Sequence, residues 1–246
     1  MIDIFRSEWT KLRSVRSTLW TLGVTALLMI GISALLTASA TNSADGPVPA
    51  DQGIMLSLMG VKFASLSMAT LGVLVISSEY RTGGIRTSLM AVPRRINLLT
   101  GKAVVFTGVS LVVSTLAAAA SVATGLMIMK PTSIGWAETA QVVAGAGLYL
   151  TVCGLFGLGL GTLIRHTPGA IVTAIALMMV LPQLTSALPG QWGKTVSDYF
   201  TTNAGELVVI PRDSSSLGPW DGLAVYFAWV AVALIAGAVL LKRRDA

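Results

Sequence analysis

Six long apolar runs, separated by short polar stretches, constrain this chain more than any other feature. A helix that crosses a bilayer needs about 20 residues, usually about 17 to 25, and most of the runs have that length. The second run is short unless it begins near Leu56, which places Lys62 inside the outer leaflet. We expect its side chain to reach the interface; the alternative is a lysine in a transport path. The sequence therefore predicts an all-α, polytopic membrane protein with six transmembrane helices. The runs are Leu19–Leu36, Phe63–Ser77, Ala103–Met129, Gln141–Ile164, Pro168–Leu188 and Asp221–Leu241.

The low charge content supports this reading. Only 11% of the residues are charged, whereas a soluble domain carries about 25% because its surface must be solvated. Much of the surface is therefore expected to avoid water. The single cysteine, Cys153, lies inside an apolar run, which excludes a disulfide framework and a cysteine metal cluster. We expect Cys153 to pack in the core.

The distribution of basic residues predicts the orientation. Only four of the 17 Lys and Arg residues lie on one side of the runs, and the remainder flank the other side. Because the richer side faces the cytoplasm, both termini and the loop Ser78–Lys102 are expected there, in a multi-pass protein of a bacterial plasma membrane. The sequence Ala38-Ser39-Ala40 is similar to a cleavage site, but the leader before it is long and contains Asp3 and Glu8. We therefore expect a retained first helix.

The N-terminal segment has the pattern of an amphipathic helix. Apolar side chains recur on one helical face, with Phe5, Trp9 and Leu12 among them and Arg13 beside them. Such a helix rests in the membrane interface, with its tryptophan at headgroup depth. We predict an interfacial helix over residues 1–18; the alternative is a basic tail that only sets the orientation.

The stretch SEYRTGGIRTSLMAVPRR, Ser78–Arg95, lies between the second and third runs. The Thr82 hydroxyl can cap a short helix, and Pro93 restricts the residue before it and stops that helix. Two adjacent glycines allow the chain to turn sharply out of the membrane. We predict a short helix over residues 82–92. Its apolar side is formed by Ile85, Leu89 and Val92.

These two segments carry a family resemblance. SEWTKLRSVRSTLWTL and SEYRTGGIRTSLMAVPRR, followed by Gly101-Lys102-Ala103, resemble permease subunits of ABC-2 type transporters of the actinobacterial type, and the resemblance extends over the whole chain. It implies an elbow helix at the N-terminus and a coupling helix at 82–92 that docks on a separate cytoplasmic ATPase. It also implies that the ATPase-coupling residues are Glu79, Tyr80, Arg81, Gly83, Gly84, Ile85, Arg86, Leu89 and Pro93.

The chain carries no motor of its own. The closest approach to a P-loop is Gly193-Lys194-Thr195, but Leu188 stands where that motif needs glycine. We therefore expect no enzyme activity and no cofactor in this chain, with MgATP bound by the partner ATPase. His166 is the only histidine and lies in a short turn, so neither a metalloprotease nor a Ser–His protease is expected.

Two transport classes remain. The resemblance implies an exporter of a hydrophobic or amphiphilic compound; the alternative is an ion-coupled secondary transporter. Ion-coupled carriers usually place ionisable groups near the bilayer midplane, and here the runs are nearly free of them. The glycine-rich run Gly154–Gly161 is read as a helix-packing surface.

The expected organisation is a single permease domain over residues 1–246. Its expected partners are cytoplasmic ATPase subunits, a second permease copy (identical or paralogous) and membrane lipid, with no nucleic acid. The region 189–219, with Trp192, Tyr199 and Phe200, is read either as interfacial segments on the outer leaflet or as an ordinary loop. The predicted spans are 19–37, 56–77, 103–129, 141–164, 168–188 and 221–241.

Overall fold

The computed structural model of the protein describes residues 2–43, 49–83, 95–131, 133–212 and 214–243. These residues are mainly helical, and none of them is assigned to a strand. Six of the described helical segments are long and apolar enough to cross a membrane, which confirms the predicted all-α fold with six candidate spans. They are Arg16–Ser43, Ala50–Arg81, Ile96–Met129, Trp136–Ile164, Thr167–Ser186 and Pro219–Leu241.

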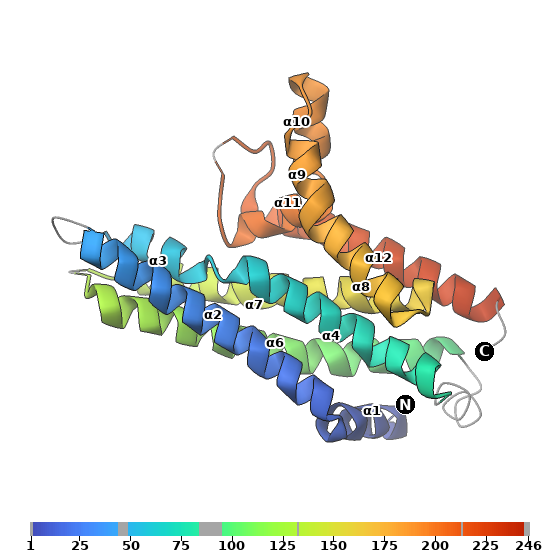
Figure 1. The fold of residues 1–246 in the computed structure, drawn as a ribbon. Coiled ribbons are helices and arrows are strands. Elements are labelled where there is room, and N and C mark those ends of the chain that lie inside the picture. The colour runs from blue at the N-terminus through green and yellow to red at the C-terminus, as the bar shows by residue number, and fades with distance from the viewer. Residues whose placement is uncertain (1, 44–48, 84–94, 132, 213, 244–246) are drawn as a thin grey trace.

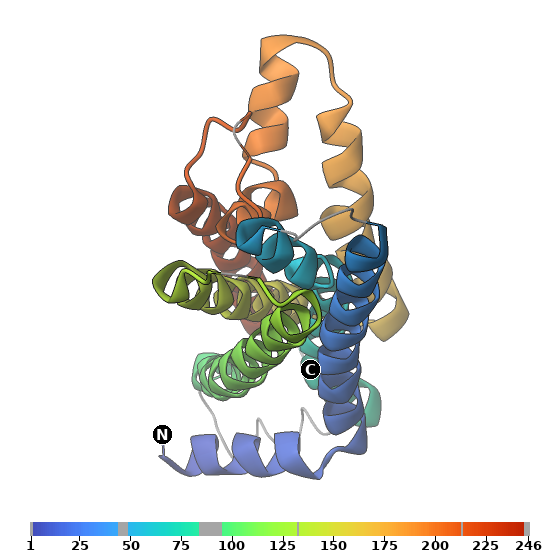
Figure 2. The same cartoon turned by 90° about the vertical axis from the view of Figure 1, so that its left-hand side faces the viewer.

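Five long helices form the bundle. They run side by side in Figure 1, and Figure 2 looks along several of them. The end of α12 and the crosswise helix α1 (Ile2–Ser14) lie at the same end of this bundle, which we call the α1 end. The bundle helices are α2 (Arg16–Ser43), α4 (Val61–Thr82), α6 (Arg95–Met129), α7 (Trp136–Ile164) and α12 (Pro219–Arg243).

The second span consists of two helices, α3 (Ala50–Leu58) and α4. Thr82, which the sequence predicted to cap the next helix, is the last residue of α4. The helix ends there because the backbone of Gly83, the next residue, has a left-handed conformation with φ +71°.

The centre of the bundle is α7, the most deeply buried of the candidate spans. Its glycines allow the α4 backbone to approach closely. A Cβ atom added at Gly72 would lie 1.9 Å from the carbonyl oxygen of Gly154, and one added at Gly157 would lie 2.0 Å from that of Ala69. The glycine-rich run therefore forms a helix-packing surface. Cys153 is fully buried beside it.

The fifth span bends away from the bundle. It begins as α8, which packs on α4 and α7, and then passes through the π-helical segment η1 into α9. In Figure 1, α9 and α10 stand away from the long helices. The bounds are α8 (Thr167–Ile175), η1 (Ala176–Val180), α9 (Leu181–Ser186) and α10 (Gly190–Asp198).

The π-helical segment is supported by residues far along the chain. The hydroxyls of Thr201 and Thr202 donate hydrogen bonds of 2.8 Å to the carbonyl oxygens of Leu177 and Met178. Both threonines belong to α11 (Thr201–Gly205), which leads into the 3-10 turn η2 (Glu206–Val208) and then back to α12. Together with α10, these segments make much of the region 189–219 helical.

Candidate functional site

The structure describes four of the predicted ATPase-coupling residues. Glu79, Tyr80 and Arg81 form the last turn of α4, and Gly83 follows directly. Arg81 is exposed, whereas Glu79 and Tyr80 are half-buried. The remaining coupling residues lie outside the described residues, as does most of the predicted 82–92 helix. They are Gly84, Ile85, Arg86, Leu89 and Pro93.

The predicted elbow helix corresponds to α1, which lies crosswise at the end of the bundle (Figure 2). Its apolar side chains do not all face the same way. Leu12 is buried and Phe5 is half-buried, whereas the Trp9 side chain is 53% exposed and Arg13 is exposed. The helix packs against α6, where a Cβ atom at Gly101 would meet Ile4. Leu12 therefore anchors α1 to the bundle while Trp9 points outward.

Four charged side chains join α1 to the bundle, and we call them the ionic ring. Lys102 Nζ lies 2.5 Å from Glu8 Oε2 and 2.8 Å from Glu79 Oε1. Lys11 Nζ lies 2.7 Å from Glu8 Oε1 and 3.0 Å from the same Glu79 oxygen. Each lysine therefore bridges both carboxylates, and the two positive and two negative charges balance.

The bundle side of the ionic ring is buried, and its other side is partly exposed. The side chains of Glu8 and Lys102 are each 3% exposed, whereas that of Lys11 is 38% exposed. Partial burial by itself would lower the pKa of the Lys11 ammonium, but the hydrogen bonds and charges of Glu8 and Glu79 outweigh it, so this pKa is raised. The ring therefore stays charged at neutral pH on the side of Lys11.

The ring holds together the helices on either side of residues 84–94. Glu79 lies in the last turn of α4, and Lys102 lies about two turns inside α6, which begins at Arg95. Glu8 and Lys11 add α1 to the same cluster. A force on the segment between α4 and α6 therefore acts on all three helices at once.

The sequence analysis did not identify Glu8 and Lys102 as site residues. Glu8 was weighed against a cleavable leader and Lys102 for orientation, and both lie in stretches that carry the family resemblance, but neither was given a role of its own. The available signals were an acidic residue within a basic segment and a lysine at the start of a long apolar run. Because these two residues are 94 positions apart, their pairing could not be read from local spacing.

A second set of contacts connects the end of α4 to the α7–α8 turn. The Arg165 guanidinium carbon lies 5.1 Å from the centre of the Tyr80 ring, a cation–π distance. Arg165 also donates a 3.3 Å hydrogen bond to the carbonyl oxygen of Leu240 in α12. Thr167 donates to Ser77 Oγ at 2.9 Å. The end of α4 is thus tied to α8 and α12 as well as to α1 and α6.

A different ionic cluster lies at the other end of α4, and we call it the Glu206 cluster. Glu206 Oε2 lies 3.0 Å from Arg212 and 3.6 Å from Lys62. The Glu206 side chain is 11% exposed, but that of Lys62 is 55% exposed. Burial raises the pKa of the Glu206 carboxyl, although Lys62 and Arg212 act in the opposite direction.

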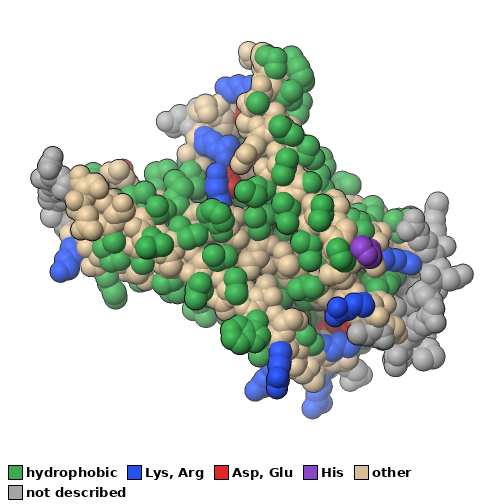
Figure 3. Space-filling view, viewed as in Figure 1, with side chains coloured by type: hydrophobic (Ala, Val, Ile, Leu, Met, Phe, Trp, Pro, Cys, Tyr) green, Lys and Arg blue, Asp and Glu red, His purple; other side chains and the backbone are tan. Residues whose placement is uncertain are grey.

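The surface shows where charge gathers. In Figure 3, hydrophobic side chains spread over the middle of the visible face, and Lys and Arg side chains gather at the α1 end. Among the described residues, no group of three or more His, Cys, Asp or Glu is placed to hold a metal ion. The α1 end therefore offers a charged surface for contact.

Comparison with known proteins identifies the family. A search of curated proteins found no significant match. A family model described as ABC-2 family transporter protein matches residues 4–182, which include the ionic ring, the segment between α4 and α6, and the α7–α8 turn. The match covers most of the chain. The chain therefore belongs to the ABC-2 family of transporter proteins.

Proposed function

We propose that this membrane subunit of an ABC transporter is an exporter that moves a hydrophobic or amphiphilic compound outward. The family match supports a membrane subunit whose ATPase is a separate chain. The excess of Lys and Arg at the α1 end supports a cytoplasmic location for that end, and thus for the ATPase. The proposed setting is the plasma membrane of a bacterium, with both termini in the cytoplasm.

The observation that carries the proposal is the ionic ring. An ATPase that engages residues 84–94 pulls on the end of α4 and the start of α6, to which Glu79 and Lys102 belong. Because Glu8 and Lys102 are buried, separating them would leave each of these charges with a single partner in a low-dielectric environment. The three helices therefore move as one body.

The movement passes from that body to the fifth span. Tyr80 and Ser77, in the last turns of α4, contact Arg165 and Thr167 at the start of α8. Beyond α8, the π-helical segment leads into α9, which stands away from the long helices in Figure 1. Because α8 packs on both α4 and α7, a displacement of α4 is expected to shift α8 as well.

The apolar surface of the fifth span supports a second permease copy, identical or paralogous, as a partner. Val172, Met179 and Leu184 are 65%, 44% and 58% exposed. In an assembled transporter this face meets lipid or a neighbouring permease, and a pathway between two such faces suits apolar cargo better than an ion. The same reasoning favours ATP-driven export over ion-coupled uptake.

A mild-detergent purification of the tagged protein from its own host tests the proposal. An ATPase with a P-loop should co-purify with the wild type and be lost in Arg86→Glu, because that change reverses a charge in the docking segment. Lys194→Glu is the matched control, since Lys194 is exposed in α10, and it should retain the ATPase.

Two results together would contradict the proposal. If the chain purifies alone, and if transport stops with a proton ionophore but continues after ATP depletion, the coupling proposal is wrong. The ion-coupled secondary transporter would then be the better description.

A further inference from the structure

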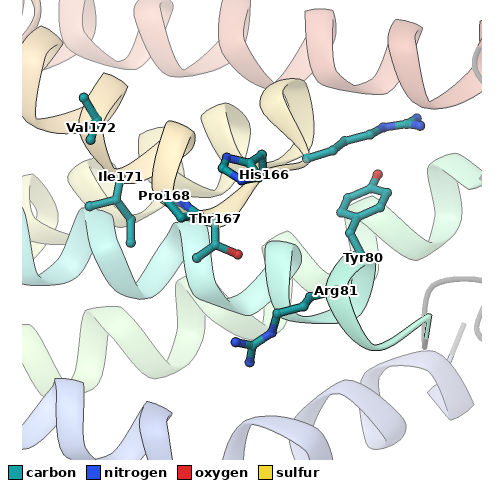
Figure 4. A pocket seen from close by; sticks show the side chains of 8 residues that line it. Tyr80, Arg81, His166, Thr167, Pro168, Ile171 and Val172 are labelled. Atoms are coloured by element: carbon teal, nitrogen blue, oxygen red, sulfur yellow. The ribbon is translucent and has the colours of Figure 1, made fainter.

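A cavity of about 710 Å³ opens between the end of α4, the α7–α8 turn and the first turns of α8 (Figure 4). Its volume lies within the range of roughly 300–1,000 Å³ that is typical of small-molecule sites. Because α4 ends at Thr82 and α7 ends at Ile164, we expect the mouth of the cavity to lie at the level where these helices leave the hydrocarbon. This level is the depth of lipid headgroups.

The walls at the turn are basic. Arg81, Arg165 and His166 contribute to the lining, and none of the described lining residues is acidic. Glu79, the nearest carboxylate along α4, is occupied by the two lysines of the ionic ring. Arg81 and His166 are both exposed. The cavity thus has the charge to attract an anion and no carboxylate of its own to repel one.

The two ring nitrogens of His166 have different hydrogen-bonding roles. Its Nδ1 accepts a 3.2 Å hydrogen bond from the backbone N–H of Gly169, which caps α8. In the neutral imidazole the proton therefore resides on Nε2, so that atom can donate to an anionic oxygen. Figure 4 shows the His166 ring and the Arg81 side chain on opposite walls of the cavity. The cavity is thus lined by one donor from the α7–α8 turn and by another from the end of α4.

The remaining lining consists of Tyr80, Thr167 and three apolar side chains of α8. Pro168, Ile171 and Val172 follow the turn along α8, and Val172 is 65% exposed. The apolar surface continues to Ile175, one turn deeper. The site therefore changes from basic to apolar along the direction in which a lipid extends from its phosphate into its acyl chains.

We propose that this cavity binds the headgroup of an anionic phospholipid from the leaflet at the α1 end. Basic pockets between transmembrane helices recognise such headgroups, with arginines on the phosphate. A free phosphate would gain nothing from the apolar wall, and a zwitterionic lipid would present its own positive charge to the arginines. This proposal does not depend on the direction of transport or on the ATPase.

Native mass spectrometry of the purified protein with added phosphatidylglycerol or phosphatidylcholine of the same acyl chains tests the site. The wild type should retain phosphatidylglycerol preferentially. A basic side chain beside an anionic headgroup contributes about five-fold in affinity, so Arg81→Gln combined with His166→Asn should weaken retention at least about ten-fold. Asparagine keeps an oxygen that can accept from Gly169 N–H, so α8 stays capped.

Two controls distinguish the site from general attraction of acidic lipid. Lys130→Gln combined with Lys194→Gln removes two exposed cations elsewhere and should leave retention unchanged. Glycerol phosphate, which has the charge but no acyl chains, should not displace the lipid. Unchanged thermal unfolding of lipid-free Arg81→Gln/His166→Asn would show that the variant is folded.

Three results would overturn the proposal. The first is equal retention of the two lipids by the wild type. The second is an equal loss of retention in the site variant and in the control variant. The third is displacement of the lipid by glycerol phosphate, which would identify a site for a soluble anion.

Discussion

The two ends of α4 carry ionic clusters of opposite character. The ionic ring at one end pairs two carboxylates with two lysines, and its central pair, Glu8 and Lys102, is almost completely buried. The Glu206 cluster at the other end pairs one carboxylate with two cations, of which Lys62 is more than half exposed. The first joins three helices; the second joins the start of α4 to the segment before α12.

The difference shows that the same types of residue can serve different purposes. A buried ion pair is costly to break because each partner left alone is a charge in a low-dielectric environment. An exposed pair is cheap to break because water replaces the lost partner. The ring is thus suited to transmitting force without coming apart, whereas the Glu206 cluster can exchange its partners.

The largest expected effect comes from Lys102→Met. It leaves the buried Glu8 carboxylate with Lys11 alone, so we expect a loss of about 3–5 kcal/mol in the free energy of unfolding. Denaturant unfolding in lipid nanodiscs measures it. Lys62→Met is the matched control and should cost less than about 1 kcal/mol. Equal losses in the two variants would show that burial does not distinguish the two clusters.

A smaller effect is expected for coupling within each cluster. In a double-mutant cycle, Glu8→Gln and Lys102→Met should cost less together than the sum of the two single changes, with a coupling energy of about 1–3 kcal/mol. The corresponding cycle of Glu206→Gln and Lys62→Met should give less than about 0.5 kcal/mol. Additive losses at the ring would contradict a direct interaction between Glu8 and Lys102.

The smallest effect, and one that depends on pH, is expected for Glu206→Gln. Burial raises the pKa of Glu206 in the folded protein, so the folded state binds a proton more readily than the unfolded state does. The stability that this carboxyl contributes is complete below its unfolded pKa and is lost as the pH rises through its folded pKa.

The free energy of unfolding of Glu206→Gln should therefore increase relative to that of the wild type as the pH rises from about 4 towards 7, by less than about 1 kcal/mol. Thermal unfolding of both proteins across this range measures the difference. If the variant instead becomes relatively less stable towards neutral pH, the ion pairs with Lys62 and Arg212 outweigh burial, and the raised pKa is wrong.

The spans could be predicted from sequence because hydropathy over about 20 residues is a local property. The ends of the helices were harder to predict from sequence. The third span was predicted to begin at Ala103, but α6 begins at Arg95, and this earlier start is what carries Lys102 into the bundle. The sequence placed Thr82 at the start of the segment 82–92, whereas it is the last residue of α4, and Gly83 follows with a left-handed backbone.

The ionic ring and the bend in the fifth span depend on contacts between distant residues. Nothing within 176–180 itself indicates a π-helical segment, whose carbonyl oxygens are bound by Thr201 and Thr202 from 24 positions away. Lys102 and Glu8 are further apart still. Pattern and spacing describe neighbours along the chain, so tertiary pairs of this kind appear only in the structure.

The separation of Glu8 from Lys102 also bears on how the protein is made. The chain emerges N-terminus first at about 5–20 residues per second, so the 94 positions between them correspond to about 5 to 20 seconds of synthesis. Throughout that interval, Lys11 is the only member of the ring that α1 itself offers to Glu8. Closure of the ring therefore has to wait until the start of the third span has been synthesised, and α1 acquires its final position only after the second span is complete.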